Sequence, residues 1–399
     1  MLAKAAHKTY MKALKIAARI IPIPRPTLFT GADSAASLCE AIGLMNLGKL
    51  LIVTDKPLVE VGIVGKVERS LTHAGIEFVR YDGVLPDPTY LQAEEGLALY
   101  RQEQCMGVLA IGGGSPIDCA KVIAARVTNQ KSIKRLAGLL KVWRTPAPLF
   151  AIPTTAGTGS EVTVAAVISE PKHHQKTPLM DPKLVPLMAA LDPTLMTELP
   201  PSITAATGMD ALTHAVEAYL SNNATTETDA YATAALKLIH GNLLAAYKDG
   251  KSLKVRLNMA MASYYAGLAF TKASLGYAHA IAHQLGAKYG TPHGVANALA
   301  LPLVLDASLP SATSRMAKLA LLTERGDRKW DDETNAKAFI NYVVDLQIGL
   351  GISRTLPTIQ TEDIPTLAKN AVRETHWNYP VPHYLTRTQC EQIFTQLKG

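Results

Sequence analysis

The alternation of short apolar runs with helical stretches constrains the fold of this chain more than any other feature of its sequence. Four runs rich in Val, Ile, Leu and Phe in the first half have the length and composition of buried strands. Helical patterns lie between them, for example over residues 93–103 and 117–127. Strands that alternate with helices predict a mostly parallel sheet with helices on both faces. The expected strands cover residues 49–55, 76–81, 107–111 and 148–152.

From about Pro201 the pattern changes to helices alone, and the pair Pro200-Pro201 marks the change. A chain of 399 residues is long enough for two or three domains that each bury a core. We therefore predict a basic helix over residues 1–24, an α/β domain over 25–199 and an all-helical domain over 200–399. The expected helices of the last domain cover residues 203–221, 226–247, 253–269, 274–287, 293–305, 311–323 and 333–350.

The positive charge of the chain is concentrated at its start. There are 40 Lys and Arg against 33 Asp and Glu, and six basic residues but no acidic one precede Asp33. The remaining chain is nearly neutral, which argues against a nucleic-acid-binding surface across the fold. Five of the six basic residues form one stripe of a helix. We favour a helix on the solvated surface of the protein over one that lies on an anionic membrane. The stripe consists of Lys4, Lys8, Lys12, Lys15 and Arg19.

The four cysteines exclude some classes of protein. None of them is paired at CxxC spacing, which excludes a disulfide scaffold and a cysteine zinc knuckle and fits a reducing compartment. No apolar run approaches the ~20 residues of a membrane span, and no secretory signal is expected. We therefore expect a cytoplasmic protein.

A glycine-rich turn after the third expected strand is a candidate phosphate site. Gly112, Gly113 and Gly114 let the backbone approach a ligand closely. We expect Ser115 to be the N-cap of the following helix and Asp118 to be the acidic partner of a capping box. Free N–H groups and the helix dipole would favour a phosphate. The alternative is a tight, well-capped strand-to-helix turn.

A second loop, over residues 153–161, follows the next expected strand. It contains Thr154, Thr155 and Thr158 and lies where open α/β sheets bind ligands. Asp55 closes the first expected strand, and its carboxylate can accept hydrogen bonds from a ribose diol. Asp55 can equally be a turn or helix cap before Lys56-Pro57.

Pairs of metal-binding side chains recur at helical spacing in the last domain. Asp210 and His214 are four residues apart, as are His279 and His283, and His293 opens another apolar helix. One carboxylate and three imidazoles suit ferrous iron or zinc with a position left for substrate. A nicotinamide cofactor on the glycine turn and an alcohol oxygen on the metal would allow hydride transfer in a cleft between the domains. A further histidine would carry the hydroxyl proton.

Several long motifs, in this order, strongly resemble the iron-containing (group III) alcohol dehydrogenases. The resemblance extends from about Pro26 to the end of the helical domain and implies a Rossmann-like first domain with a helical second one, the architecture of dehydroquinate synthase. The motifs are Gly-Gly-Gly-Ser-Pro-Ile-Asp (112–118), Pro-Thr-Thr-Ala-Gly-Thr-Gly-Ser-Glu (153–161), Gly-Met-Asp-Ala-Leu-Thr-His-Ala (208–215), His-Ala-Ile-Ala-His-Gln-Leu-Gly (279–286) and Thr-Pro-His-Gly (291–294).

The resemblance also implies roles for individual residues. The metal ligands would be Asp210, His214, His279 and His293, with His283 as the proton relay. Asp55 would favour NAD over NADP. The other NAD-binding residues would be Asp87, Gly112, Gly113, Gly114, Ser115, Asp118, Thr154, Thr155, Thr158 and Lys176.

Our leading hypothesis is therefore a metal-dependent, NAD-linked dehydrogenase of small alcohols or aldehydes, with ferrous iron or zinc. The resemblance further implies a homo-oligomer. One alternative is a hydroxyacid–oxoacid transhydrogenase, in which the nucleotide never leaves. Another is a zinc lyase of the dehydroquinate-synthase type, which would need more phosphate-binding Lys and Arg in the helical domain.

Overall fold

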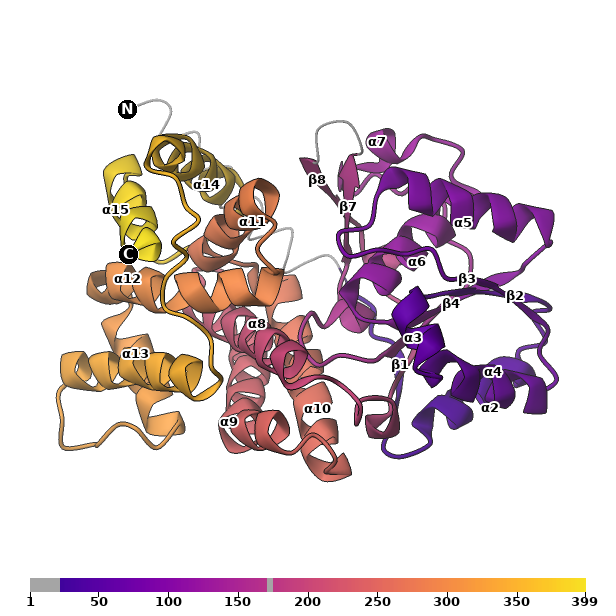
Figure 1. The fold of residues 1–399 in the computed structure, drawn as a ribbon, viewed down its shortest axis with the longest axis horizontal. Coiled ribbons are helices and arrows are strands. Elements are labelled where there is room, and N and C mark those ends of the chain that lie inside the picture. Colours follow the sequence, from indigo (N-terminus) through magenta and orange to yellow (C-terminus); the bar gives the residue numbers. More distant parts are fainter. Residues whose placement is uncertain (1–21, 171–174) are drawn as a thin grey trace. The chain divides into compact units, whose positions relative to one another are not determined.

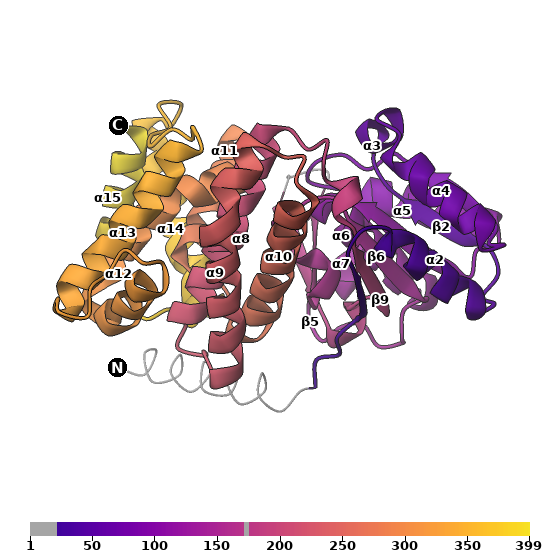
Figure 2. The ribbon, with the colours of Figure 1, turned by 90° about the horizontal axis from the view of Figure 1, so that it is seen from below.

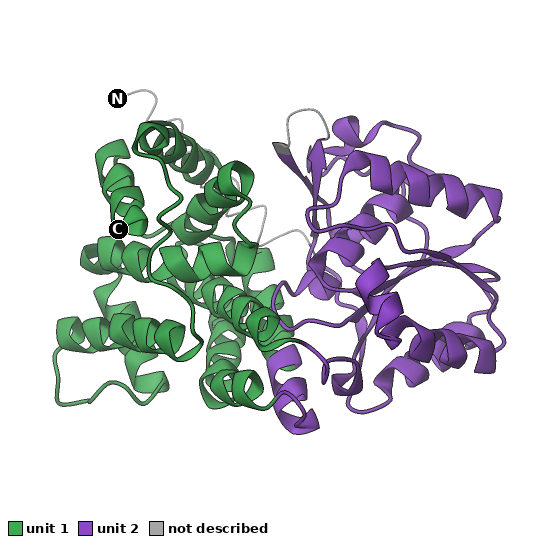
Figure 3. Ribbon diagram, viewed as in Figure 1, with its two compact units in different colours: residues 1–21, 200–249, 261–399 green, residues 22–199, 250–260 purple. Residues whose placement is uncertain are grey.

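The computed structural model describes residues 22–170 and 175–399. These residues form two compact units, which Figure 3 colours separately. The α/β unit contains Pro22–Leu199 and Gly250–Ala260, and the helical unit contains Pro200–Asp249 and Met261–Gly399. The basic helix predicted over residues 1–24 lies, as far as Ile21, outside the described residues.

A six-stranded sheet, in which every pair of neighbouring strands is parallel, forms the centre of the α/β unit. This confirms the predicted fold class. The four expected strands are present, and the structure adds one at an edge and one inside the sheet that we did not predict. In spatial order the strands are β1 (Thr27–Thr30), β9 (Met188–Leu191), β6 (Leu149–Pro153), β4 (Gly107–Gly112), β2 (Leu50–Val53) and β3 (Phe78–Tyr81).

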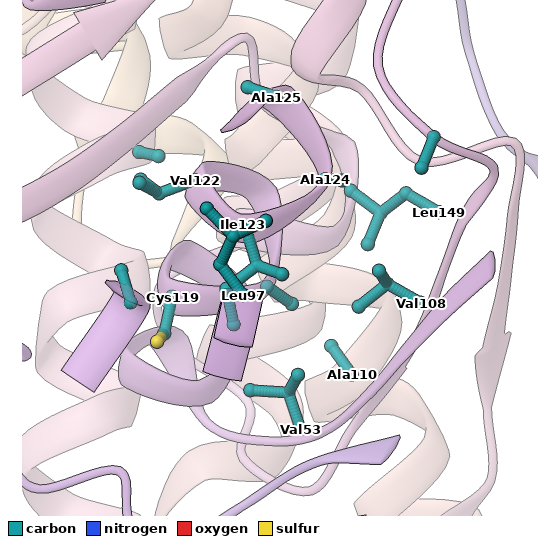
Figure 4. Packing of buried hydrophobic residues seen from close by; sticks show 14 of the residues in the cluster. Val53, Leu97, Val108, Ala110, Cys119, Val122, Ile123, Ala124, Ala125 and Leu149 are labelled. Atoms are coloured by element: carbon teal, nitrogen blue, oxygen red, sulfur yellow. The ribbon is translucent and has the colours of Figure 1, made fainter. Parts of the chain in front are cut away.

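Helices cover both faces of this sheet (Figure 1). On one face α2 (Ser34–Leu44) and α4 (Ile63–His73) pack on the strands through side chains such as Leu38 and Val67. On the other face α5 (Tyr90–Gln102) and α6 (Gly114–Thr128) pack on them through a cluster that includes Leu97 and Ile123 (Figure 4). Burial on both faces explains why β2 and β4 are apolar at every position.

A smaller sheet and several short helices complete the α/β unit. The sheet has the order β5-β8-β7, with β8 antiparallel to β7. These elements are β5 (Gly138–Leu139), β7 (Ala165–Glu170), β8 (Gln175–Met180), α3 (Lys56–Glu60), α7 (Ile133–Leu136) and the 3₁₀ turns Ser160–Val162, Pro182–Leu184 and Pro193–Leu195.

The helical unit is built from long helices that bury most of their apolar residues against one another. Its first two helices, α8 and α9, pack side by side (Figure 2). The helix α10 is divided between the two units at Ala260. The helices are α8 (Pro201–Leu220), α9 (Thr226–Lys248), α10 (Leu253–Ala273), α11 (Tyr277–Tyr289), α12 (His293–Leu322), α13 (Asp332–Gly349), α14 (Ile364–Asn378) and α15 (Arg387–Lys398), with a 3₁₀ turn at Thr361–Asp363.

One prediction for this unit was wrong. The two helices expected over 293–305 and 311–323 form the single helix α12, with Pro302 and Pro310 inside it. Each proline costs α12 one backbone hydrogen bond, and packing against α8, α11 and α13 offsets that cost. By length and composition alone α12 could also cross a membrane, but most of its apolar window is buried within the helical unit.

Candidate active site

The glycine turn joins β4 to the start of α6 in the α/β unit. The helix begins at Gly114 with Gly113 as its N-cap, so the predicted N-cap role of Ser115 was wrong. Since Gly113 has no side chain, no side-chain cap hydrogen bond is made at this helix start. The first N–H groups of a helix have no partners within it, and the dipole adds positive potential there. The turn therefore has the chemistry of an anion-binding site.

The second loop packs directly on this turn, because β6 is the neighbour of β4 in the sheet. The N–H of Thr154 donates to the carbonyl oxygen of Gly112 at 3.0 Å. A Cβ added to Gly114 would lie 2.7 Å from Cγ2 of Thr158, so this close approach requires glycine. The structure thus brings both candidate cofactor loops together at the carboxyl ends of adjacent parallel strands.

Asp118 holds the second loop in place. Its carboxylate accepts a hydrogen bond from the Ser160 hydroxyl at 2.5 Å and another from the N–H of Val167 at 2.9 Å. The predicted capping-box role was therefore wrong, because the carboxylate is used by one residue of the second loop and one that follows it, rather than by its own helix start. Burial raises the pKa of Asp118, while the nearby ammonium groups of Lys121 and Lys176 work against that rise.

Asp55 is the N-cap of α3, which confirms the prediction that it can be a helix cap before Lys56-Pro57. Its Oδ1 accepts a hydrogen bond from the N–H of Leu58 at 3.0 Å. Burial raises the pKa of this carboxyl, and the hydrogen bond from Leu58 lowers it. The capping bond uses only part of the acceptor capacity of this carboxylate, which could still accept from a ribose diol.

Two further residues of the expected cofactor site meet in an ion pair. Nζ of Lys176, on β8, lies 2.7 Å from Oδ1 of Asp87. The loop that holds Asp87 is tied to β7 by a hydrogen bond from the N–H of Ser169 to the carbonyl oxygen of Pro88 at 2.7 Å. Asp87 is mostly exposed, so this pair can open toward a ligand at little cost.

Three of the expected metal ligands converge in the helical unit. Asp210 comes from α8, His279 from α11 and His293 from the first position of α12, and one donor atom of each lies within 4.8 Å of the others. Oδ1 of Asp210 is 3.7 Å from Nε2 of His279 and 3.5 Å from Nε2 of His293. These spacings would let one ion contact all three side chains.

His279 is prepared to act as a metal ligand. With Glu217 ionised, Nδ1 of His279 donates to Oε2 of Glu217 at 2.6 Å, because a carboxylate oxygen only accepts, and Nε2 is left with the lone pair. Nε2 is buried and has no hydrogen-bond partner. Burial, followed by the neighbouring His214, lowers the pKa of His279 well below its usual range, so the ring is neutral. A neutral imidazole, a carboxylate and an unpartnered nitrogen fit a divalent metal.

The other two histidines lie beside this group. The ring of His214 stacks on that of His279, with centroids 4.5 Å apart, and His214 is not part of the three-residue group. The ring of His283 stacks on that of His293 at 5.5 Å. Nδ1 of His283 contacts Oε1 of Glu374 on α14 at 2.7 Å. All five candidate side chains thus share one region of the helical unit.

Three residues of this region were missed in the sequence analysis. Nδ2 of Asn297 donates to Oδ1 of Asp210 at 2.7 Å, and Glu217 and Glu374 each contact a histidine. Helical spacing could have revealed two of them, because Glu217 follows Asp210 by seven residues and Asn297 follows His293 by four. Glu374 comes from a distant helix, and no local spacing points to it.

Comparisons with known proteins agree with this geometry. Residues 25–193 match the family described as iron-containing alcohol dehydrogenase, and residues 204–397 match the C-terminal part of the Fe-containing alcohol dehydrogenase family. The chain is 39% identical over 359 residues to alcohol dehydrogenase 4 of Saccharomyces cerevisiae, which covers 89% of this chain and 93% of that protein. It is 38% identical over 351 residues to the NAD-dependent methanol dehydrogenase of Bacillus methanolicus, which covers 88% and 92%.

A solved structure agrees over nearly the whole chain. The crystal structure of a 1,3-propanediol oxidoreductase superposes with a TM-score of 0.92 at 37% identity and covers 95% of this chain and 100% of its own. The chain belongs to the iron-containing alcohol dehydrogenase family. It is an oxidoreductase, and its chemistry is the interconversion of alcohols and aldehydes.

Proposed function

We propose that the protein is an iron-dependent, NAD-linked dehydrogenase that interconverts small alcohols and aldehydes. The observation that carries this proposal is the convergence of Asp210, His279 and His293 around a buried nitrogen with no hydrogen-bond partner. The similar methanol dehydrogenase of Bacillus methanolicus is named NAD-dependent, which supports the nucleotide.

The residues of the α/β unit would bind the nucleotide. The uncapped start of α6 at Gly113–Ser115 suits the pyrophosphate, and the hydroxyls of Thr154, Thr155 and Thr158 lie on the loop packed against it. Oδ2 of Asp55 would accept from a ribose hydroxyl and repel a 2′-phosphate, which favours NAD. The ion pair of Asp87 and Lys176 flanks the same region, and Asp118 acts indirectly by holding the second loop.

The residues of the helical unit would hold the metal and move the proton. We assign Asp210, His214, His279 and His293 as ligands, and the stacking of His214 on His279 supports the inclusion of His214. When bound, ferrous iron, or zinc in its place, would act as a Lewis acid toward the substrate oxygen, and NAD would accept the hydride. Asn297 orients Asp210, and Glu217 holds His279 with Nε2 toward the ligand group. His283, stacked on His293, would take the hydroxyl proton.

Turnover with free nucleotide tests this proposal. The protein is purified without oxygen, loaded with ferrous iron and offered NAD with short primary alcohols, while NADH is followed by its absorbance near ~340 nm. We expect a rate that a chelator abolishes and iron restores. His279→Ala should lose bound metal and turnover but retain NAD binding, and Gly113→Val should weaken NAD binding but retain the metal. Full metal content but no rate with any alcohol would contradict the proposal and favour the transhydrogenase or the lyase.

Location and assembly are part of the proposal. All four cysteines are free and buried, which supports a reducing compartment such as the cytoplasm. Light scattering tests the homo-oligomer implied by the resemblance to the family. Co-sedimentation with anionic vesicles, before and after removal of the residues preceding Pro22, tests the alternative that the basic segment contacts a membrane.

A further inference from the structure

Glu374 accepts hydrogen bonds from three side chains of the helical unit. Its Oε1 lies 2.7 Å from Nδ1 of His283 and accepts from the hydroxyl of Tyr379 at 2.8 Å. Its Oε2 accepts from Nε2 of Gln284 at 3.3 Å. Both carboxylate oxygens are therefore engaged, which fixes the rotation of the Glu374 side chain.

Glu374 accepts these hydrogen bonds, so Tyr379 and Nδ1 of His283 must each carry the proton that is donated. Burial, together with the charge of Glu374, raises the pKa of Tyr379 well above its usual range, so the tyrosine keeps its proton and donates it. A carboxylate has no proton to give, so the bond to His283 must be donated by Nδ1–H. In a neutral ring the lone pair is then on Nε2. Nδ1 cannot serve as an acceptor while this contact exists.

The contact also fixes the plane of the ring. His283 lies between Glu374 on one side and the ring of His293, at an interplanar angle of 14°, on another. About a quarter of the His283 side chain is exposed, so a proton that the ring receives has a route to water. A histidine of this kind, oriented by a carboxylate and next to a metal site, has the arrangement of a general base.

We propose that Glu374 is a positioning residue that holds His283 in the Nδ1–H tautomer, with Nε2 as the acceptor of the substrate proton. The inference rests on the proposed function. In alcohol oxidation the hydroxyl proton would pass to Nε2 of His283 while bound NAD accepts the hydride of the alcohol carbon, and the imidazolium would then release the proton to water. Throughout this sequence Nδ1–H remains bonded to Glu374, so the ring does not turn.

The tautomer of His283 can be measured without any turnover. The full chain is labelled with nitrogen-15 at histidine and examined by NMR in metal-free and zinc-loaded forms, with the signals of His283 assigned from a His283→Asn variant. We expect a protonated Nδ1 and an unprotonated Nε2 in the wild type and in Glu374→Gln, whose amide oxygen can still accept. In Glu374→Ala the ring should distribute between both tautomers. An unchanged His283 tautomer in Glu374→Ala would overturn the inference, whether or not the enzyme oxidises alcohols.

Kinetics provide the second measurement. Glu374→Ala should lower kcat roughly ten- to a hundredfold, because the acceptor nitrogen is no longer held in place, with KM for NAD and metal content unchanged. Glu374→Gln should recover most of the rate. The matched control is Glu333→Ala on α13, which removes an exposed glutamate paired with Lys337 and should leave kcat unchanged. An altered His283 tautomer with unchanged kcat would contradict the role of His283 as proton relay. An inactive wild-type enzyme would contradict the proposed function. In that case the NMR result would still decide whether Glu374 fixes the tautomer of His283.

Discussion

Two histidines one helical turn apart on α11 are each held by a glutamate from another helix. His279 donates from Nδ1 to Glu217 on α8, and His283 donates from Nδ1 to Glu374 on α14. Both rings therefore keep their lone pair on Nε2. The two contacts have different proposed roles, because Nε2 of His279 lies 3.7 Å from Asp210 in the proposed metal site, whereas Nε2 of His283 is the proposed proton acceptor. A carboxylate in this position fixes the tautomer and raises the basicity of its histidine.

The first prediction concerns Glu217. Its carboxylate accepts from Nδ1 of His279 and from the N–H groups of Gly276 and Ala278, at 2.6, 2.8 and 2.7 Å. Both oxygens of Glu217 accept hydrogen bonds, so in Glu217→Gln the amide NH₂ must face one of these donors. One hydrogen bond is then replaced by repulsion between two N–H groups. We expect the affinity for zinc or cobalt to fall about 10- to 100-fold at a pH above 7, where Glu217, with a pKa of about 7, is ionised. Titration of metal into the metal-free protein measures this, with Glu391→Gln as the control, and equal affinities would contradict it.

The second prediction concerns Glu161, which is buried beside Lys121 in the α/β unit. Burial raises the pKa of Glu161 from its usual 4.5 to about 7. The unfolded chain therefore loses this proton at a lower pH than the folded one, and the free energy of unfolding falls as the pH rises from 4.5 to 7. Lys121 donates to Thr163 and Ala165, so a change at residue 161 leaves its hydrogen bonds intact.

Glu161→Gln removes the titrating group and keeps its shape. We expect the variant to be more stable than the wild type at about pH 8, by at most about 3 kcal/mol, and equal to it at about pH 4. Denaturant unfolding at the two pH values, with Glu77→Gln on the surface as the control, measures the difference. A variant with the same pH dependence as the wild type would show that Glu161 does not titrate as stated.

Among the elements, the helices that carry the proposed metal ligands depend on close backbone contacts. The start of α12 packs closely against the backbone of α8. A Cβ added to Gly294 would lie 2.1 Å from the carbonyl oxygen of Ala206 on α8. His293 directly precedes this contact, so the packing of two backbones determines its position. Such a contact cannot yield by rotating a side chain.

The third prediction follows from this contact. In Gly294→Ala the two helices must separate, which we expect to lower the free energy of unfolding by roughly 1–3 kcal/mol and to weaken metal binding. Gly241→Ala is the matched control, because this exposed glycine of α9 has nothing near its added Cβ. That change should stabilise the protein by about 0.5–1 kcal/mol, because alanine favours the helix. Equal effects of the two variants would contradict the role of the contact.

The elements also show which parts of the molecule local sequence can predict. Strands β2 and β4 were predictable because burial on both faces makes them continuously apolar. Strands β1 and β9 are short, and the sequences Thr-Leu-Phe-Thr and Met-Ala-Ala-Leu have no pattern that separates them from a loop or helix. At the site, the ligand pairs were visible through their helical spacing, whereas Glu374 depends on which helices meet, and spacing does not contain that information.

At the scale of the whole molecule, the two units are not two consecutive pieces of chain. The α/β unit includes Gly250–Ala260, which follows two helices of the other unit. Arg256 links this segment to the end of the preceding part of the α/β unit. Its Nε donates to the carbonyl oxygen of Gly250 at 2.9 Å, and its Nη2 donates to the carbonyl oxygen of Leu199 at 3.2 Å. The Arg256 side chain is buried, and its two hydrogen bonds to these carbonyl groups are partly buried.

The fourth prediction concerns these hydrogen bonds of Arg256. Arg256→Gln should cost about 1–3 kcal/mol of stability, because it removes the donor from two partly buried carbonyl groups. We expect faster hydrogen exchange in residues 188–199 and 250–260, and unchanged metal affinity. Lys254→Gln, an exposed change on the same helix, is the control. Exchange that increases equally throughout the helical unit would contradict this prediction.

The pairing of β1 with β9 has a consequence for synthesis in the cell. Thr27 pairs with Met188, about 160 residues later, and β1 has no other neighbour in its sheet. At about 5–20 residues per second, a ribosome needs roughly 10–30 seconds to reach β9 after completing β1. During that time Leu28 and Phe29 have no sheet to join, so a nascent chain of this protein presents an apolar strand to chaperones long before its first domain can close.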